Sequence, residues 1–422
     1  MKKEKKIKIL VVPSDRTGVG YFRSTKPHIQ LETNYPEEFK IDIDFEANLD
    51  DDNFLKNYDI IHYHRTLGDY AKVEERLARI KKLGVVTIMD LDDYWSPGSH
   101  HPSYLTIKNE GLDKKILNNI ILAENITTTT PLFVDELKRY NKNVFVLPNS
   151  IDPTEKQFIP NPESSDRLRI GWLGGSSHLE DLKLLNGMSG KLKSDGLIDK
   201  VQFVLCGYDL RGNVIMINKD TGEKQSRAIT PKESVWYRYE QIITDDYKIV
   251  SPEYKEFLLK FERKEYPNIQ DQPYRRVWTK PISTYAMNYN LFDVSIAPLA
   301  EHTFNKVKSQ LKVIEAGFHK KAIIAQNYGP YTIDLKSIYD RPKKGEEMLM
   351  NKDGNALLVD KNKNHKDWYR NIKRLVQNPD LVEELRERLH ETVKDTYNID
   401  EITKQRRELY INLLKNKGKD LA

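Results

Sequence analysis

Short apolar runs alternate with helix-like stretches through the first part of this sequence, and the alternation restricts the possible folds. The run at residues 7–13 (IKILVVP) precedes a glycine loop, and each later run is followed by a stretch with helical character. Strands that alternate with helices predict a parallel sheet covered on both faces. The sequence therefore predicts an α/β fold. The apolar runs of this first series are residues 7–13, 58–65, 85–95, 125–131 and 144–152.

A second series of the same kind follows a break in the pattern. Residues 153–167 (PTEKQFIPNPESSDR) have no apolar period and hold several prolines, which is typical of a linker. The chain has 422 residues, more than one hydrophobic core normally holds. We therefore expect two Rossmann-like domains. The expected parts are a first domain at 1–155, a second domain at 165–400, and a C-terminal helix at about 400–422 that packs back on the first.

The second series is interrupted between about residues 210 and 281. The segment GNVIMINKDTGEK has turn residues near 220–222 and predicts a hairpin, and the stretch after it is rich in tyrosine and charge. We interpret 210–281 as an insertion of a hairpin and helices in the second domain, without an assigned role.

Composition excludes several classes of protein. The net charge of +5 comes from 68 basic and 63 acidic residues, which is too mild to require a nucleic-acid partner. The single cysteine, Cys206, excludes an intramolecular disulfide and fits a reducing compartment. No apolar run approaches the roughly 18 residues that span a bilayer. We expect a cytoplasmic protein, with peripheral membrane contact and oligomeric state left open.

The segment 304–317, FNKVKSQLKVIEAG, has the spacing of an amphipathic helix. Val307, Leu311, Ile314 and Phe318 recur at helical intervals and predict one apolar face. The alternative is an ordinary surface helix whose charged face is solvated, since such faces are common.

Two cations and a carboxylate share a neighbouring face of that predicted helix. Lys308, Lys312 and Glu315 lie at i, i+4 and i+7, with Lys308 expected in the opening turn. A helix start presents free N–H groups and a partial positive charge, so with Ser309 it suits a phosphate or diphosphate. Glu315 could accept hydrogen bonds from sugar hydroxyls.

One glycine turn follows the first strand of each series. Gly18 and Gly20 form a Gly-x-Gly that lacks the third glycine of a dinucleotide fingerprint, which disfavours NAD. These glycines also suit a simple tight turn. The second turn comprises Gly174 and Gly175, followed by Ser176, Ser177 and His178.

Several of these segments resemble the GT-B glycosyltransferases, most closely the family-four (group 1) retaining enzymes of bacteria and phages. IGWLGGSSHLEDL, FDVSIAPLAEHTFNKVKSQLKVIEAG and KKAIIAQNYGPY are similar to their donor domain, and DIIHYHR and MDLDDYW resemble their acceptor-domain strands. The resemblance covers most of the chain except about 210–281. It implies two Rossmann-like domains that face each other across a cleft, with the nucleotide-sugar donor bound by the second.

The resemblance has two departures. Family four usually carries two glutamates separated by seven residues; Glu315 matches the second, which the family uses for the ribose, but Val307 stands at the first. The family's Arg and Lys clamp on the diphosphate is also not evident after the first strand of the second series. We expect the amides of the second glycine turn and Lys308 to share that work.

The resemblance implies transfer of a hexose or pentose from a UDP-type donor to an acceptor hydroxyl, with retention, no metal and no cofactor. Fixed donors that stabilise the departing diphosphate would supply most of the rate. We expect Lys308, His64 and Asp92 to be catalytic. The expected donor-binding residues are Gly18, Gly20, Gly174, Gly175, Ser176, His178, Asn305, Ser309, Lys312 and Glu315.

Alternatives remain open at this point. Asp90, Asp92 and Asp93 contain an Asp-x-Asp that could hold a divalent metal, although it lies far in sequence from the Lys–Glu segment. A nucleotide-sugar epimerase or dehydrogenase, and a non-catalytic nucleotide-sugar-binding protein favoured by Val307, are the competing functions. The acceptor is open among polysaccharide, teichoic-type polymer, protein and hydroxymethylated phage DNA.

Overall fold

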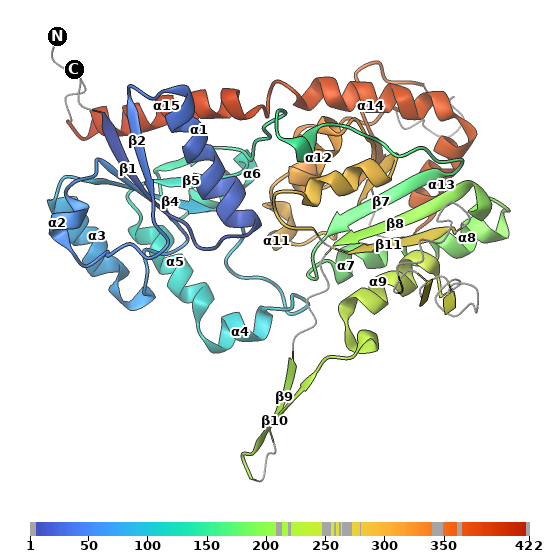
Figure 1. Cartoon of the computed structure of the whole chain (residues 1–422), viewed down its shortest axis with the longest axis horizontal. Coiled ribbons are helices and arrows are strands. Elements are labelled where there is room, and N and C mark those ends of the chain that lie inside the picture. The colour runs from blue at the N-terminus through green and yellow to red at the C-terminus, as the bar shows by residue number, and fades with distance from the viewer. Residues whose placement is uncertain are drawn as a thin grey trace.

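The chain folds around two parallel six-stranded sheets that lie side by side (Figure 1). Their strand orders are β2-β1-β3-β4-β5-β6 and β11-β8-β7-β12-β13-β14, and helices flank both. The α/β prediction with two Rossmann-like units is therefore confirmed. The computed structural model describes residues 6–207, 213–217, 221–246, 255–256, 259–260, 263, 272–278, 280–339, 349–360 and 365–418.

The first sheet contains a strand from each apolar run of the first series, and one more. The extra strand is β2, FKIDI, whose alternation of apolar and charged residues suits an edge strand with one solvated face. The strands are β1 (Ile7–Val12), β2 (Phe39–Ile43), β3 (Ile60–His64), β4 (Val86–Leu91), β5 (Ile126–Thr128) and β6 (Val144–Val146). The helices are η1 (Gly20–Thr25), α1 (Lys26–Asn34), α2 (Asp52–Leu55), η2 (Tyr70–Lys72), α3 (Val73–Lys82), α4 (Tyr104–Asn109), α5 (Leu112–Leu122) and α6 (Pro131–Leu137).

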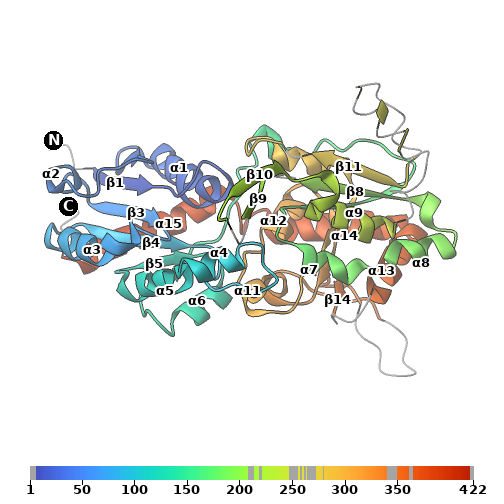
Figure 2. The same ribbon diagram turned by 90° about the horizontal axis from the view of Figure 1, so that it is seen from below.

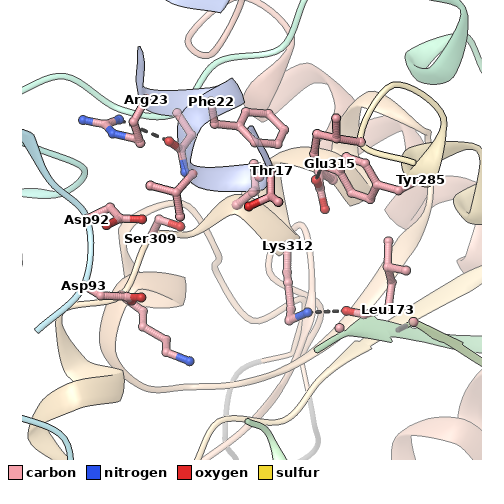
Figure 3. Close-up of a pocket in the computed structure, with 18 of the residues that line it drawn as sticks. Thr17, Phe22, Arg23, Asp92, Asp93, Leu173, Tyr285, Ser309, Lys312 and Glu315 are labelled. Carbon is pink, nitrogen blue, oxygen red and sulfur yellow. Dashed lines mark hydrogen bonds between the residues drawn. The ribbon is translucent and has the colours of Figure 1, made fainter. Parts of the chain in front are cut away.

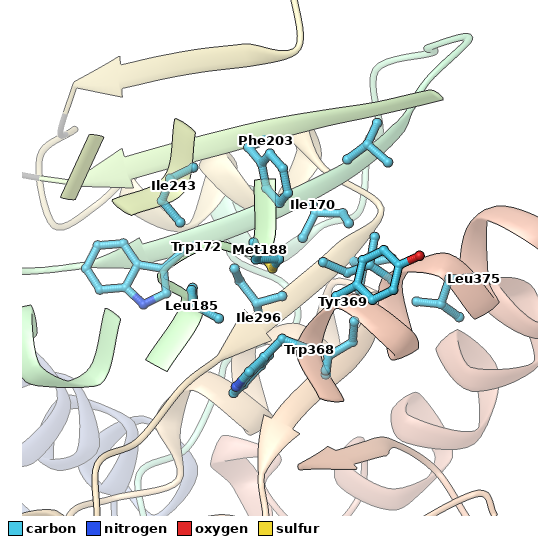
Figure 4. Packing of buried hydrophobic residues seen from close by; sticks show 14 of the residues in the cluster. Ile170, Trp172, Leu185, Met188, Phe203, Ile243, Ile296, Trp368, Tyr369 and Leu375 are labelled. Carbon is cyan, nitrogen blue, oxygen red and sulfur yellow. The ribbon is translucent and has the colours of Figure 1, made fainter. Parts of the chain in front are cut away.

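The second sheet packs its helices over a core rich in aromatic residues. Trp172 and Phe203, on neighbouring strands, are buried together with Trp368 of α13 (Figure 4). The strands are β7 (Leu168–Gly174), β8 (Val201–Gly207), β11 (Tyr274–Trp278), β12 (Val294–Ala297), β13 (Ala322–Gln326) and β14 (Leu357–Val359). The helices and 3₁₀ turns are η3 (Lys156–Phe158), α7 (Leu179–Leu182), η4 (Lys183–Leu185), α8 (Met188–Ser194), η5 (Ile198–Lys200), α9 (Val235–Thr244), η7 (Tyr285–Leu291), α11 (Thr303–Lys306), α12 (Leu311–Phe318), η8 (Gly329–Ile333), α13 (Lys366–Gln377) and α14 (Pro379–Val393).

The stretch 210–281 is only in part an insertion. Its predicted hairpin is present as the antiparallel strands β9 (Asn213–Ile217) and β10 (Lys224–Ala228), which project from the body in Figure 1 and are foreshortened near the middle of Figure 2. The predicted turn residue Asp220 lies outside the described residues. After η6 (Pro231–Glu233), however, α9 buries Trp236 and Tyr239 in the second core, and β11 pairs with β8. Both of these elements belong to the second sheet's own architecture.

The C-terminal helices span both halves of the molecule. Figure 1 shows α14 over the second half and α15 (Ile399–Asn416) over the first. Tyr410 and Leu414 of α15 are buried with Ile9 of β1. The chain passes between the two halves twice, near Ile151 and near Asn398, and a parallel β-bridge joins these two residues. Within the described residues, none of the helices is both long and apolar enough to cross a membrane.

Candidate functional site

A cavity of about 820 Å³ opens between the two halves of the molecule (Figure 3). It is lined by the loop after β1, by residues following β4, by the end of β7 and the turn after it, by the last residue of β8, and by the chain around α12. The carboxyl ends of parallel strands therefore meet at it, which is where open α/β sheets bind ligands. Of the residues expected to form the site, those that line it are Gly18, Asp92, Gly174, His178, Lys308, Ser309, Lys312 and Glu315.

The segment expected to be one helix is two helices with a break between them. α11 ends at Lys306 and α12 begins at Leu311, so Lys308 lies in the connection and its expected place in a helical first turn is wrong. The cause is packing: Val307 is buried in the core of the first sheet, whereas Ile314 is buried in a cluster of the second half. One straight helix cannot send both side chains to opposite sides of the cleft.

Lys312 takes the place in the first turn that was expected of Lys308. Its ammonium group donates to the carbonyl oxygen of Leu173 at the end of β7 (Figure 3) and lies 5.1 Å from the ring centre of Trp172. Burial lowers the pKa of Lys312 to about 8, with Lys308 adding to the shift and Glu315 opposing it. Because a buried ammonium group is costly to keep charged, binding an anion beside it is favourable.

Lys308 lies on the same wall without a carboxylate partner. Its ammonium group sits 4.9 Å from the ring centre of Phe304. Among the described residues, no carboxylate lies within the 4.0 Å ion-pair distance of either Lys308 or Lys312. Two ammonium groups beside one cavity, neither of them in an ion pair among the described residues, suit a ligand with more than one negative charge.

Glu315 lies at the end of this wall, held by two tyrosines. Its carboxylate is 4% exposed and accepts hydrogen bonds from the hydroxyls of Tyr285 and, at 2.9 Å, Tyr289. Burial raises the pKa of Glu315, and the two hydroxyls oppose that rise. A carboxylate has about four lone-pair sites, so positions remain for ligand hydroxyls. Tyr285 lines the cavity and was not singled out from the sequence, although Tyr285 and Tyr289 share a helical interval.

His178 presents a neutral ring to the cavity. Its Nδ1 lies 2.6 Å from Asp181, whose other oxygen accepts from the Ala300 amide at 2.8 Å and from Asn305 Nδ2 at 2.7 Å. Burial, reinforced by Lys308, lowers the pKa of His178 to about 4. At neutral pH Nδ1 therefore donates to Asp181 and Nε2 is left as an acceptor. Asn305, expected to bind the donor, lies outside the lining and fixes Asp181 instead.

The two glycine turns contribute only part of what was expected. Gly18 and Gly174 line the cavity, but Gly20, Gly175 and Ser176 do not. A Cβ at Gly20 would lie 1.9 Å from the carbonyl oxygen of Asp15, so this glycine is required by the tight turn. Ser176 accepts a hydrogen bond from the Trp236 indole at 3.1 Å.

The first half contributes Asp92 and Asp93 to the cavity. His64 is 4% exposed and lies behind Asp92, with its Nε2 2.9 Å from Asp92 Oδ1. It was expected at the site but does not line the cavity. Burial raises the pKa of Asp92, but His64 and Arg65 outweigh it and hold that pKa below its ordinary value. The role that the geometry leaves to His64 is to orient Asp92.

Asp90, the first residue of the Asp-x-Asp, lies in a buried ion pair with Arg23. Both its oxygens accept from Arg23, at 2.9 and 2.8 Å, and Thr127 donates to it at 2.7 Å. Across the described ranges, no group of three or more His, Cys, Asp or Glu residues is placed to hold a metal ion. The Asp-x-Asp alternative therefore loses its first ligand to a buried ion pair.

Comparison of the structure with solved structures identifies the arrangement. No known protein family and no curated protein matches the sequence. Sucrose-phosphate synthase from Thermosynechococcus elongatus matches with a TM-score of 0.56 and 12% identity over 98% of this chain and 100% of that one. The catalytic domain of Arabidopsis thaliana starch synthase IV, bound to ADP and acarbose, matches with 0.55 and 11% over 98% and 100%. The chain has the GT-B fold.

Anabaena HepE, in complex with UDP and glucose, shares the GT-B fold as well. It matches with a TM-score of 0.51 and 11% identity over 96% of this chain and 99% of that one. Identities this low establish the fold alone. Within this GT-B chain, both halves contribute charged side chains to the cavity: Lys280, Lys308, Lys312 and Glu315 from the second, and Arg16, Arg23, Asp92 and Asp93 from the first.

Proposed function

We propose that this chain is a glycosyltransferase that moves a sugar from a nucleotide diphosphate sugar to an acceptor hydroxyl. The observation that carries the proposal is the wall of the interdomain cavity formed by Lys308, Lys312 and Glu315. Two ammonium groups without carboxylate partners suit a diphosphate, and a buried carboxylate beside them suits a ribose. The GT-B fold, with its cleft between two Rossmann-like domains, is consistent with a nucleotide diphosphate sugar bound in this cavity.

The diphosphate is the leaving group, and its developing charge is what the site must stabilise. Lys312 stands in the first turn of α12, where free amides and the helix dipole favour an anion. In this structure its ammonium group bonds to the Leu173 carbonyl. When the donor binds, Lys312 exchanges that carbonyl for a phosphate oxygen and Lys308 contacts the same group.

The nucleotide is placed by Glu315. Tyr285 and Tyr289 hold its carboxylate in position, so the remaining lone pairs accept the two ribose hydroxyls without a search through rotamers. We propose UDP as the nucleotide. Support comes from the HepE structures, which contain UDP or UDP-glucose, whereas the starch synthase IV structure contains ADP.

Transfer is proposed to proceed with retention, as in the family-four enzymes that the sequence resembles. The bond between the anomeric carbon and the diphosphate oxygen breaks while the acceptor oxygen bonds to the same face of the sugar. The acceptor proton passes to the departing diphosphate. Val307 stands where family four carries its first glutamate, and its side chain is buried in the first core and cannot contact the sugar. We propose that His178 Nε2 accepts a hydrogen bond from a sugar hydroxyl instead.

We propose that the reaction needs no metal, because the two lysines supply the positive charge that a divalent cation would bring. Activity is therefore expected to be unchanged in EDTA. Loss of transfer in EDTA with recovery on adding manganese would contradict this part of the proposal.

The proposed function is tested by a thermal-shift screen of nucleotide sugars against the full chain, followed by assay of UDP release. We expect a UDP-sugar to raise the Tm, and slow UDP release without an acceptor. Lys308→Ala and Glu315→Ala are expected to reduce both strongly, and wild-type behaviour in both variants would contradict the site. NAD is expected to leave the Tm unchanged; a rise would favour the epimerase or dehydrogenase alternative.

A further inference from the structure

We infer that the acceptor is a neutral, polyhydroxylated molecule such as a sugar, with no phosphate near the accepting hydroxyl. This rests on the proposed function, because it assigns the part of the cavity that the donor leaves free. The geometry points to Asp93, together with Asp92, as the residues that bind the acceptor hydroxyls.

Asp93 is a cavity-lining carboxylate to which the described part of the chain offers no hydrogen-bond donor. Asp92 beside it is bonded to His64 at 2.9 Å, but no described residue donates a hydrogen bond to Asp93. Figure 3 shows both carboxylates on the wall opposite Leu173 and Glu315. A partly buried carboxylate without donors loses the hydrogen bonds that water would give it, and ligand hydroxyls restore them.

The two carboxylates differ in their readiness to hold a proton. Burial, reinforced by the neighbouring Asp92, raises the pKa of Asp93 against the opposing charges of Lys308, Arg65 and His64, whereas the pKa of Asp92 is held low by His64 and Arg65. Asp92 therefore accepts hydrogen bonds, while Asp93 can accept or, when protonated, donate. Adjacent hydroxyls of a sugar, each both donor and acceptor, match such a pair.

The charges on this wall disfavour an anionic acceptor. The Arg23 guanidinium is committed to Asp90, whereas Arg16 remains a charged lining residue of this half, with its guanidinium 3.9 Å from the ring centre of Phe45. The lysines of the opposite wall are taken by the diphosphate in the proposed function. An acceptor phosphate beside Asp93 would meet like charges on both sides, from the two aspartates and from the donor.

The test uses the full-length protein saturated with UDP and a panel of neutral hexoses and disaccharides with their 6-phosphates, followed by saturation-transfer NMR. At least one neutral sugar is expected to bind, and its 6-phosphate to bind about tenfold more weakly. In Asp93→Asn, which keeps the side-chain shape, that difference is expected to shrink to about twofold. Asp135→Asn removes an exposed carboxylate of α6 outside the cavity and is expected to leave the ratio unchanged.

Three results would overturn the inference: equal or tighter binding of the phosphorylated sugars, no binding of any neutral sugar in the panel, or an unchanged ratio in Asp93→Asn. Salt-sensitive binding of duplex DNA to the UDP-loaded protein would overturn it as well. Failure of the proposed function is separately visible, because the protein would then not bind UDP before any sugar is added. Thermal melts of both variants establish that they are folded.

Discussion

Replacing Lys312 by methionine tests the diphosphate site most specifically. Methionine keeps the length and apolar stem that packs near Trp172 and removes only the ammonium group. A hydrogen bond to a charged group contributes about 1.5–3 kcal/mol, which corresponds to a loss of about 10- to 150-fold in UDP affinity. Calorimetric titration of UDP into the wild-type protein and Lys312→Met at pH 7 measures this loss.

The same lysine predicts a pH dependence whose sign follows from its pKa. Burial lowers the pKa of Lys312 to about 8, so most molecules carry the charge at pH 7 and about a tenth of them at pH 9. UDP binds the charged form, so affinity is nearly constant below about pH 7, falls about twofold by pH 8 and about tenfold by pH 9. The lysine takes up a proton on binding, because the bound anion raises its pKa.

Lys312→Met is also the control for this pH dependence. Ionisation of UDP itself and of other residues affects both proteins alike, so the difference between the two pH profiles isolates Lys312. The variant is expected to show the smaller decline. Parallel profiles from pH 7 to 9, or an unchanged dissociation constant at pH 7, would refute the reasoning.

Three further predictions concern the surrounding structure. Glu315→Gln is expected to weaken UDP binding about tenfold in calorimetry but to leave inorganic diphosphate binding unchanged; equal losses would contradict a ribose contact. Arg23→Ala leaves Asp90 buried and unpaired, so urea denaturation should show a loss of about 3–5 kcal/mol, and a loss below about 1 would contradict it. Gly329→Ala, where φ is +57° and the new Cβ lies 3.0 Å from the Asn305 carbonyl oxygen, should cost more stability than Gly196→Ala, where φ is +68° in open space. Equal costs would show that the close approach to α11 is unimportant.

The general architecture could be predicted from the sequence because both sheets bury continuous apolar strands. The edge strands β2 and β11 escaped notice for a shared reason. Each mixes charged with apolar residues, as in FKIDI and YRRVW, and β11 also follows a long stretch without regular alternation. Local pattern identifies buried central strands far better than edges.

Most of the residues expected at the site line the cavity, but the contacts that several of them make could not be predicted. The helical spacing of Val307 and Ile314 predicts one continuous helix. The two side chains enter cores on opposite sides of the cleft, and sequence periodicity carries no information about that. The role of Asn305 depends on Asp181, which is distant in sequence, and that of His64 depends on Asp92. Such pairings arise only when the sheets bring distant strand ends together.

The central claim is that the second half of this GT-B chain grips a diphosphate with Lys308 and Lys312 and a ribose with Glu315. A crystal structure of the protein soaked with UDP tests it most directly. We expect the diphosphate between the two ammonium groups, with Lys312 released from the Leu173 carbonyl, and both ribose hydroxyls on Glu315. Density for UDP outside this cavity, with Lys312 still bonded to Leu173, would contradict the account.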